Sequence, residues 1–312
     1  MAIAEQAQKP RPVSTRSGVS TGVAGYLFIT PSLIFIAIFV IGPIIGTLWY
    51  SLTSYDLMSS PRYIGLANFE RLIDDDRFSR SMTNSLLFAF GTVPTGVITS
   101  LLLATLINRQ IRGIYTFRAL FYMPVVSSFV SVSLIWLWMY EPQMGLLNEG
   151  FEALGLPRLK WMRSAQTAML SIIIMSVWKN MGLNMVIYLA GLQGVPPHLY
   201  ESAEIDGAGR ISQFLRITVP LLAPTTFFVV IVYFIGALQM FVQVFIMTQG
   251  QANTSEWGGP LDSTLTVVVL VYQNAFEYLK MGYASAVSFM LLLVAGVITI
   301  INARVLRYDI GW

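Results

Sequence analysis

The sequence predicts an all-α membrane protein that crosses the lipid bilayer six times. The chain has 312 residues, of which 55% are hydrophobic and only 11% are charged, whereas soluble domains contain roughly 25% charged residues. The mean hydropathy is +0.66. Apolar runs of about 20 residues or more recur along the chain, and each is long enough to cross roughly 30 Å of hydrocarbon as a helix. These observations predict a polytopic helical fold.

The first apolar run follows a polar tail. Residues 1–24 contain Lys9, Arg11 and Arg16 and are predicted to be a cytoplasmic tail. Residues 25–49 contain no charged residue and form the first predicted span. A secretory signal would have a shorter apolar core and a small-residue cleavage site, so we expect this span to be retained. Pro31 and Pro43 are expected to kink it, which membrane helices tolerate.

The other apolar runs place the remaining spans within a transmembrane domain predicted at 25–304. We expect them at residues 83–107, 119–140, 166–192, 221–248 and 281–303. Pro124 is expected to interrupt the span at 119–140. The intervals 50–80, 141–165 and 249–280 are predicted outer loops, and residues 305–312 form a second tail.

Basic residues give the orientation, because loops rich in Lys and Arg remain in the cytoplasm. The turn after the second span contains Arg109, Arg112 and Arg118 and no acidic residue. Over the whole chain the excess of basic residues on this side is small. We therefore predict that both termini and the interval 193–220 are cytoplasmic, mainly from this basic turn beside the membrane.

The composition also excludes several kinds of chemistry. The chain has no cysteine and only one histidine, His198, so we expect no disulfide, no metal site and no catalytic triad. The pattern G-x-x-x-x-G-K-[ST] is absent, so the chain lacks this ATP-binding loop. We expect no catalytic residue and no cofactor on this chain. The net charge of +3 is better explained by basic residues beside lipid than by nucleic-acid binding.

A long polar interval divides the hydrophobic second half of the chain. Residues 196–224 read as two short helices that are broken at Gly207 and stopped by Pro220. Asp206 is expected to cap the second helix. The charged and amide residues on the two helices are Glu201, Glu204, Asp206, Arg210, Gln213 and Arg216. This pattern suggests a cytoplasmic elbow that is offered to a partner.

The spacing of residues in this elbow resembles the EAA signature of bacterial ABC-importer permeases. The residues that carry the resemblance are Glu201-Ser-Ala203, Asp206-Gly207-Ala208, Phe214, Ile217, Pro220 and Pro224. Ser202 and Val219 depart from the signature by small changes. The segments IGLANFERL (64–72), GLLNEGFEALGLP (145–157), GGPLDSTLT (258–266) and GYASAVSF (282–289) are also similar to carbohydrate-uptake permeases of the maltose, lactose and glycerol-phosphate type. The resemblance covers nearly all of residues 25–305, apart from the insertion-like QANTSEW at 251–257.

The resemblance implies a type I ABC-importer permease in a bacterial or archaeal plasma membrane. Such a subunit works with a second homologous permease, an external solute-binding protein, and two ATPase subunits that hold ATP and Mg. The helix at 197–206 would dock into a groove of an ATPase. The residues implied in this coupling are Glu201, Ala203, Asp206, Gly207, Ala208 and Pro220.

Polar and aromatic residues within the spans are candidates for the substrate path. Polar groups that face lipid are costly, so they tend to face the helix bundle or a water-filled cavity. Amides and hydroxyls can bond sugar hydroxyls, and aromatic rings can cover an apolar sugar face. The candidates are Ser128, Ser131, Ser176, Trp178, Lys179, Asn180, Asn184, Gln239, Phe241 and Gln243. The alternative role for each is a hydrogen bond between helices.

Lys179 lies too deep in its span for its ammonium to reach the interface easily. It could pair with a carboxylate of a partner subunit or meet an anionic substrate. The predicted spans of this chain contain few acidic residues, so a partner within the chain is less expected.

An ion-coupled transporter, a channel and an intramembrane enzyme are the alternatives to an importer subunit. An ion-coupled secondary transporter of a small polar solute usually has carboxylates within its spans, and here the acids lie almost entirely in loops. A channel would not need an elbow of this pattern, and an intramembrane enzyme would need a clustered catalytic set. The sequence leaves open which sugar or polyol phosphate is carried.

Overall fold

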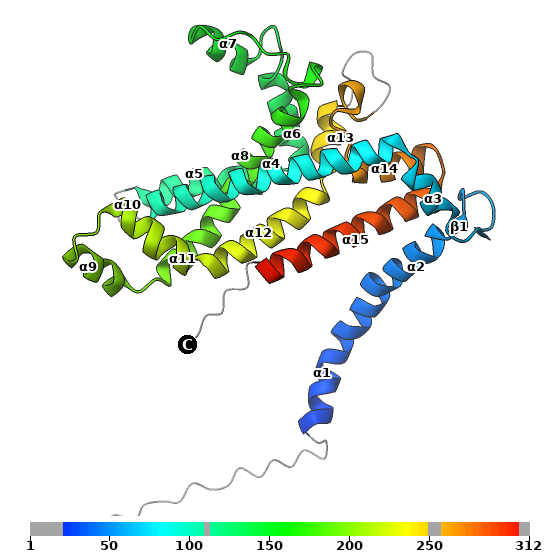
Figure 1. Cartoon of the computed structure of the whole chain (residues 1–312), viewed down its shortest axis with the longest axis horizontal. Helices are drawn as coiled ribbons and strands as arrows, with labels where there is room; N and C mark the ends of the chain where they lie inside the picture. The colour runs from blue at the N-terminus through cyan, green and yellow to red at the C-terminus, as the bar shows by residue number, and fades with distance from the viewer. Residues whose placement is uncertain (1–20, 109–112, 249–256, 306–312) are drawn as a thin grey trace, which may run out of the picture. The chain divides into compact units, whose positions relative to one another are not determined.

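The computed structural model describes residues 21–108, 113–248 and 257–305 and is almost entirely helical, which confirms the all-α prediction (Figure 1). Within these residues the only strands are β1 (Thr53–Ser54) and β2 (Arg62–Tyr63), which pair antiparallel. In this part of the chain four helices are long and apolar enough to cross a membrane, and there are up to six spans if each of two bent helix pairs counts as one. The basic residues predicted at 9–16, 109 and 112, residues 251–256 of the insertion-like segment, and the tail beyond residue 305 lie outside the described residues.

The chain divides into two compact units, residues 1–46 and 47–312, and each is described by itself. The first unit contains α1 (Thr21–Ile36), the π-helical segment η1 (Ala37–Ile41) and the start of α2 (Gly42–Ser51). They belong to a helical stretch of 27 residues from Gly25 to Ser51, in which none of the residues before Ser51 is buried. The predicted span 25–49 falls within it. An apolar helix without buried side chains is suited to lipid or to another membrane helix.

The second unit is built on two long helices, α4 (Asp76–Ile107) and α8 (Ala168–Gln193), which pack along each other. The helix α12 (Ala223–Leu238) packs against α4, and α15 (Met281–Val305) packs against α12 (Figure 1). Glycines allow close approach between these helices, as expected in membranes. A Cβ on Gly96 of α4 would lie 2.4 Å from the Tyr233 ring of α12.

The helix α4 begins before the predicted span, at Asp76. Its N-cap is Asp75, whose carboxylate accepts hydrogen bonds from the backbone N–H groups of Arg77 and Phe78. This cap satisfies donors that would otherwise lack a partner at the helix start. The added polar turns lie beyond the apolar run, so a search for hydrophobic residues does not detect them.

The predicted third span consists of two helices, α5 (Ile114–Val126) and α6 (Phe129–Met139), which are bent by 99°. The break was expected at Pro124, and this is wrong, because Pro124 remains inside α5. The chain breaks at Ser127 and Ser128, which are both extended. The Ser128 hydroxyl accepts a hydrogen bond from the Val130 N–H and caps α6. Serine is a favoured N-cap residue, and it decides where the new helix begins.

The elbow after α8 contains α9 (Pro197–Ile205), α10 (Arg210–Gln213), the π-helical segment η3 (Phe214–Thr218) and α11 (Val219–Leu221). Pro220 was expected to stop the second short helix, and this is wrong because it lies inside α11. The π-helical turn, in which the Val219 N–H bonds to the Phe214 carbonyl, precedes the proline and carries the helix past it. A bend of 66° at Leu222 separates this helix from α12. The predicted fifth span is divided again before α13 (Val242–Thr248).

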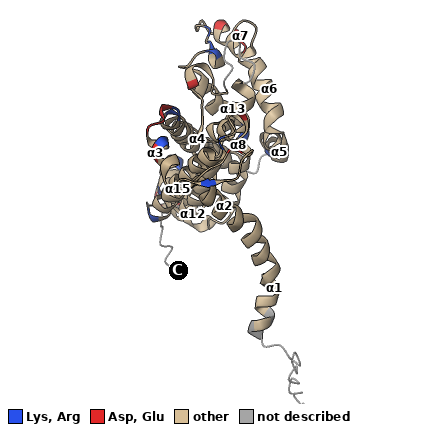
Figure 2. Ribbon diagram, turned by 90° about the vertical axis from the view of Figure 1, so that its right-hand side faces the viewer, with Lys and Arg blue, Asp and Glu red and all other residues tan. Residues whose placement is uncertain are grey.

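The predicted outer loops contain much helical structure. They include α3 (Ala67–Ile73), α7 (Leu146–Ala153), and the 3-10 turns η2 (Trp161–Arg163) and η4 (Pro260–Asp262). The interval 249–280 was predicted as a loop, but α14 (Val267–Tyr272) and the π-helical η5 (Gln273–Glu277) occupy its second half. Their apolar run is too short to cross a membrane, and it is buried against α4 and α15. Figure 2 shows charged residues of this unit around α7 and near α3, with few on the helices between.

The loop that carries α7 is fixed by one buried asparagine. Asn148 donates to the carbonyls of Pro142 and Leu159, both at 2.9 Å, and accepts from the Leu159 N–H and the Trp161 indole N–H. Its amide is therefore fully used. The segment is therefore ordered and is not an extended linker.

Candidate functional site

Helix α9 ends in a glycine turn whose hydrogen bonds follow the Schellman pattern. Gly207 has φ +80°, a left-handed conformation that favours glycine. Its N–H donates to the Glu204 carbonyl at 3.0 Å, and the Ala208 N–H donates to the Ala203 carbonyl at 2.8 Å. This pair of bonds closes a helix end. The glycine of the signature therefore terminates α9 and reverses the chain toward α10.

Asp206 does not cap the second helix as expected. It is the C-cap of α9, and α10 begins after Gly209, whose position has no side-chain cap. The physical reason is the left-handed turn at Gly207, which adds residues between Asp206 and the start of α10. The aspartate is therefore at the end of one helix and not at the beginning of the next.

The acidic residues of α9 are placed against the helix dipole. Glu201, Glu204 and Asp206 are all exposed and lie toward the C-terminal end of α9, which has no basic residue in its last turn. Negative charge at a helix C-terminus is unfavourable by several tenths of a kcal/mol. The acidic residues therefore destabilise α9 as an isolated helix. A cationic surface on a partner would offset this unfavourable interaction with the helix dipole.

Large apolar side chains accompany these charges on the elbow. Ile205 is 87% exposed, Ile211 is 77% exposed and Leu215 is 59% exposed. Exposed apolar residues that are rimmed by charge mark an interaction surface. We call the exposed residues of α9, α10 and η3 the elbow surface.

One hydrogen bond connects α9, and another connects the turn after α9, to the helix that leads into α12. The Tyr200 hydroxyl and the Thr218 hydroxyl are 2.9 Å apart. The Gln213 amide donates to the Ala208 carbonyl at 3.0 Å, and its side chain is buried. The helix α9 is therefore bonded to η3, which continues into α11.

A cavity of about 370 Å³ lies where α12 gives way to α13. It is bounded by α4, α8, α12, α13 and the first residue of α6. Its lining residues are Phe88, Phe129, Asn180, Leu183, Asn184, Val232, Tyr233, Gly236, Ala237, Gln239, Met240, Phe241, Val242 and Gln243. The predicted path residues Asn180, Asn184, Gln239, Phe241 and Gln243 are thus brought together. We call it the central cavity.

The polar side chains that line the central cavity are four amides and the Tyr233 hydroxyl. Asn184 is buried, and its Nδ2 has no hydrogen-bond partner within the described residues. Asn180 donates to the Ser176 carbonyl at 2.8 Å. Gln239 is exposed at the end of α12, and Gln243 is buried on α13. A buried donor without a partner costs about 1–3 kcal/mol, so Asn184 is a group that a ligand would satisfy.

Aromatic residues form the rest of the wall. The Phe241 ring packs on Tyr272 with the ring centroids 5.1 Å apart. Phe88, Phe129 and Tyr233 also line the cavity and were not among the predicted path residues. They lie within apolar runs, so periodicity does not distinguish them from core residues. One signal for Tyr233 is Gly96 of α4, which leaves room for its ring.

Four other predicted path residues lie elsewhere. Ser128 caps α6, and Ser131 is exposed on the same helix. Ser176 is buried on α8 and is not part of the lining. Trp178 borders a separate apolar cavity of about 290 Å³ between α6 and α8, with its ring edge-on to Trp136 at 5.6 Å.

Lys179 also lies outside the cavity lining, and its partners belong to this chain. Its side chain is only 3% exposed. The ammonium donates to the carbonyls of Pro124 at 3.1 Å, Val125 at 3.3 Å and Ser127 at 2.9 Å. A partner within the chain was judged less expected because few acids are available. That expectation was wrong because the break after α5 frees backbone carbonyls, which also accept hydrogen bonds.

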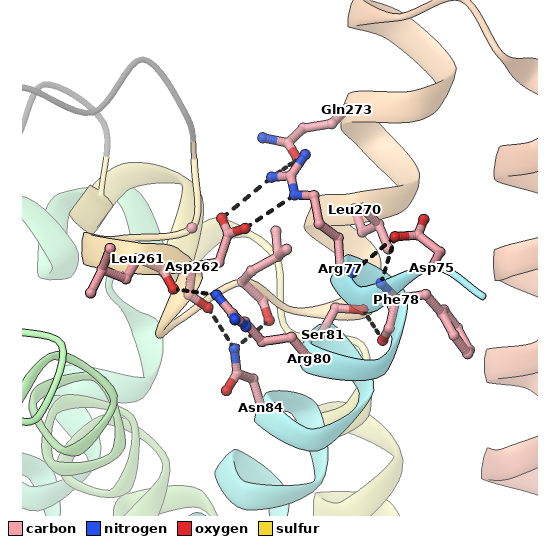
Figure 3. Close-up of polar contacts among 12 residues, drawn as sticks. Asp75, Arg77, Phe78, Arg80, Ser81, Asn84, Leu261, Asp262, Leu270 and Gln273 are labelled. Carbon is pink, nitrogen blue, oxygen red and sulfur yellow. Dashed lines mark hydrogen bonds and ion pairs between the residues drawn. The ribbon is translucent and has the colours of Figure 1, made fainter. Parts of the chain in front are cut away.

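The start of α4 is clamped to the turn before α14 (Figure 3). Arg77 forms an ion pair with Asp262, with Nε and Oδ2 3.1 Å apart, and donates to the Gln273 side chain. Arg80 donates to the Leu261 carbonyl at 2.9 Å, and Asn84 donates to the Asp262 carbonyl at 2.8 Å. Both turn residues have φ +56°, a strained conformation outside glycine. The clamp therefore fixes a strained outer turn.

Within the described residues, no group of three or more His, Cys, Asp or Glu side chains could hold a metal ion. The central cavity is lined only by uncharged residues. The arrangement can bind and release a polar molecule through amides and rings. It contains no nucleophile–base pair.

Comparison with known proteins agrees with this arrangement. Residues 11–307 match the family described as "Binding-protein-dependent transport system inner membrane component". The chain is 33% identical over 297 residues to the probable ABC transporter permease protein YesP of Bacillus subtilis, which covers 94% of each chain. It is 31% identical over 291 residues to the sn-glycerol-3-phosphate transport system permease protein UgpA of Yersinia pestis, which covers 93% of this chain and 96% of that one.

A solved structure shares the fold. A chain of a bacterial ABC transporter involved in the import of the acidic polysaccharide alginate superposes with a TM-score of 0.78 at 23% identity, over 92% of this chain and 96% of that chain. The chain belongs to the inner-membrane components of binding-protein-dependent transport systems, the permease subunits of ABC importers.

Proposed function

We propose that this permease subunit forms half of the path by which an uncharged carbohydrate crosses the plasma membrane. The buried Asn184 amide, which has a donor without a partner in the described residues, is the observation that carries the proposal. A sugar hydroxyl would accept from it. Transport needs no bond to be made or broken on this chain, so we assign it no catalytic residue and no cofactor.

The lining of the central cavity suits a sugar. Asn180, Asn184, Gln239 and Gln243 offer donors and acceptors, and Phe241 offers a ring face. Buried sites bind ligands through a mostly apolar wall with a few placed polar groups. These five residues were predicted from the sequence, and we propose them as the substrate contacts.

The absence of charged residues from the lining of the central cavity narrows the choice of substrate class. UgpA is named for sn-glycerol-3-phosphate, and the structurally similar transporter imports an acidic polysaccharide. An anion would need a cationic or strongly donating wall to offset its desolvation. The one buried charge among the described residues, Lys179, is engaged with three carbonyls and lies outside the lining. We therefore favour a neutral sugar for this half of the path.

The elbow surface is proposed as the docking site for an ATPase. Glu201 and Asp206 would meet cationic residues, and Ile205 would enter an apolar groove. Gly207 would set the angle between α9 and α10. The small side chains of Ala203 and Ala208 would keep the C-terminal end of α9 slim enough to enter the groove. Pro220 follows the π-helical turn that leads to α12. The structural neighbours include an alginate transporter in complex with its periplasmic binding protein. We infer a second permease, two ATPases that hold ATP and Mg, and an external solute-binding protein.

The proposed orientation in the membrane depends on which helix ends lie on the same side of the bundle as the elbow. Asn108, just after α4, lines a cavity with Tyr200 of α9, so the α4–α5 turn and the elbow are on the same side. Arg109 and Arg112 fall between α4 and α5, and Arg118 follows near the start of α5. The positive-inside rule places such basic residues in the cytoplasm. We propose that the elbow and both termini are cytoplasmic.

The alternative of an ion-coupled transporter is not supported. Residues 11–307 match a family of binding-protein-dependent systems, and such systems take their energy from ATPase subunits. Closing of the ATPases on ATP would move α9, and the bonds of Tyr200 and Gln213 would pass this movement to the bundle.

The coupling proposal is tested with two variants in the complete importer. Gly207→Val places a β-branched residue at φ +80°, and Glu201→Lys reverses a charge on the elbow surface. Both should reduce uptake at least about tenfold, which corresponds to about 1.4 kcal/mol of coupling. Glu70→Lys, an exposed charge reversal on α3, is the matched control. Wild-type uptake with unaltered ATPase copurification in both variants would refute the assignment.

The substrate proposal is tested by ATPase stimulation. The reconstituted complex with its binding protein is titrated with neutral mono- and disaccharides and with glycerol 3-phosphate. Stimulation by a neutral sugar is expected. Stimulation by the phosphate alone would show that the substrate is anionic and would overturn the charge argument.

A further inference from the structure

The bend between α5 and α6 leaves backbone carbonyls without helical partners. The last carbonyls of any helix lack intrahelical donors, and within a membrane each such group costs several kcal/mol if it stays unsatisfied. Here the chain leaves α5 after Val126 and turns by 99° into α6. The carbonyls of Pro124, Val125 and Ser127 converge at this bend. A donor is therefore required at this point.

Lys179 of α8 supplies a hydrogen-bond donor to each of these three carbonyls. An ammonium group has three N–H donors and no acceptor, and Lys179 directs it to three carbonyls at 2.9–3.3 Å. Its charge also lies at the C-terminal end of α5, where the helix dipole is negative. The Lys179 ammonium thus satisfies three carbonyls that would otherwise lack a hydrogen-bond donor at the bend.

A neighbouring glycine allows this contact to form. Gly182 follows Lys179 by three residues and therefore lies on the same face of α8. A Cβ at Gly182 would lie 2.1 Å from the Phe121 carbonyl oxygen, so no larger residue fits without a shift of α5. The glycine brings the backbone of α5 close to α8, and the lysine bonds its end.

The same ammonium contacts the first residue of α6. Its Nζ lies 4.2 Å from the centroid of the Phe129 ring, within the range of a cation–π interaction. Phe129 lines the central cavity, whereas Lys179 does not. The end of α5, the start of α6 and one wall of the cavity are therefore joined at a single side chain.

We propose that Lys179 is a positioning residue that holds the α5–α6 bend and thereby sets Phe129 in the wall of the central cavity. It acts through the backbone and the ring and does not contact the substrate. The effect on transport rests on the proposed function of the cavity. The structural part of the proposal does not.

The structural part is tested by thiol labelling, which the chain makes simple because it has no cysteine. Ser133 on α6 and Ser176 on α8 are both nearly fully buried and are replaced singly by cysteine in the complete importer. The thiols are labelled with N-ethylmaleimide in native membranes. In the Lys179→Met background, Ser133→Cys should react about tenfold faster, as expected if about 1.4 kcal/mol of protection is lost. Ser176→Cys should stay protected.

A conservative variant separates the proposed role from general destabilisation. Lys179→Arg retains a cationic donor and should keep Ser133→Cys protected. Unchanged protection of Ser133→Cys in Lys179→Met would overturn the proposal, because the bend would then not depend on the lysine. Equal exposure of Ser133→Cys and Ser176→Cys would overturn it as well, because packing would be lost generally.

The functional part is tested by a double-mutant cycle between Lys179 and Phe129. Lys179→Met and Phe129→Leu should each raise the half-saturating concentration of the stimulating sugar about fivefold, at similar maximal rates, and their combination should add little. Independent, multiplicative effects would overturn the link to Phe129. If no sugar stimulates the complex, the proposed function fails while the labelling result stands. If labelling fails and a sugar stimulates, only this inference is lost.

Discussion

Arg77 and Asp262 form an ion pair between residues 185 positions apart, with Nε and Oδ2 separated by 3.1 Å. The pair joins the first turn of α4 to the turn before α14. Arg77 also donates to Gln273, and Asp262 lies in a left-handed conformation at φ +56°. The ion pair therefore holds the strained turn at Asp262 against the first turn of the long helix α4.

Loss of this ion pair should destabilise the outer side of the bundle. Asp262→Ala removes the carboxylate and leaves Arg77 half-buried, so we expect a loss of about 1 kcal/mol and a lower Tm of the purified complex. Arg77→Gln should give a similar loss, and the double variant should lose less than the sum. Thermal unfolding followed by tryptophan fluorescence measures the effect.

A surface ion pair serves as the control. Arg158 is paired with Glu149 and Glu152 in the α7 loop, and all three are well exposed. The hydrogen bonds to Glu152 and then to Glu149 raise the pKa of Arg158, but water screens such pairs. Arg158→Gln should change the Tm less than Asp262→Ala does. The reverse order would contradict the assignment of the clamp to Arg77.

Replacement of Asn184 should separate stability from function. Asn184→Leu removes a buried donor that has no partner in the described residues, so the complex should be as stable as wild type or more stable. Sugar stimulation of the ATPase should weaken at least about fivefold, the loss expected for one hydrogen bond of about 1 kcal/mol.

Asn148→Leu provides the contrast to Asn184→Leu. Asn148 uses both its donor and its acceptor atoms in the α7 loop, so its replacement should lower the Tm. An Asn184→Leu complex with a lower Tm and normal sugar response would show that Asn184 is structural.

Gly182 should not tolerate even one added methyl group. The Cβ of Gly182→Ala would lie 2.1 Å from the Phe121 carbonyl oxygen, so α5 must shift, at a cost of about 1–3 kcal/mol. Gly296 on α15 has no atom within 4 Å of its added Cβ. Gly296→Ala should therefore be neutral or slightly stabilising. Equal Tm values for the two variants would disprove close packing of α5 on α8.

Tyr200 should be needed for coupling but not for assembly. Tyr200→Phe removes the hydroxyl that bonds Thr218 and leaves the exposed residues of α9 unchanged. We expect the ATPase to copurify normally while fewer sugar molecules are transported per ATP. The ratio of uptake to ATP hydrolysis in proteoliposomes is the measurement, and an unchanged ratio would show that α9 moves the bundle through other contacts.

The spans could be recognised from the sequence because their apolar runs are long. The break after Ser127 was misplaced at Pro124, since proline is a stronger signal in sequence than an extended serine pair. The helix α14 was not predicted because its apolar run, Val267–Tyr272, is too short for a membrane span. The whole interval was therefore interpreted as a loop. The helical form of α14 depends on burial against α4 and α15.

Five of the ten predicted path residues line the central cavity. Asn184 and Gln243 stand out as amides within apolar runs, and both reach the central cavity. Phe129 and Tyr233 do not stand out, because an aromatic residue within a span looks like any core residue. Trp178 was expected in the path and borders another cavity, since residues 178 and 180 point to different faces of one helix.

The sequence by itself determined the membrane class, the helical fold, and the elbow with its glycine, because composition, run length and the spacing around Gly207 are local properties. The tertiary structure alone decided the partners of Lys179. A charge deep in a span suggested a carboxylate or an anionic substrate, yet the ammonium bonds three carbonyls of another helix. Those carbonyls are free only because the chain bends by 99°, and such a bend is a property of the packed bundle.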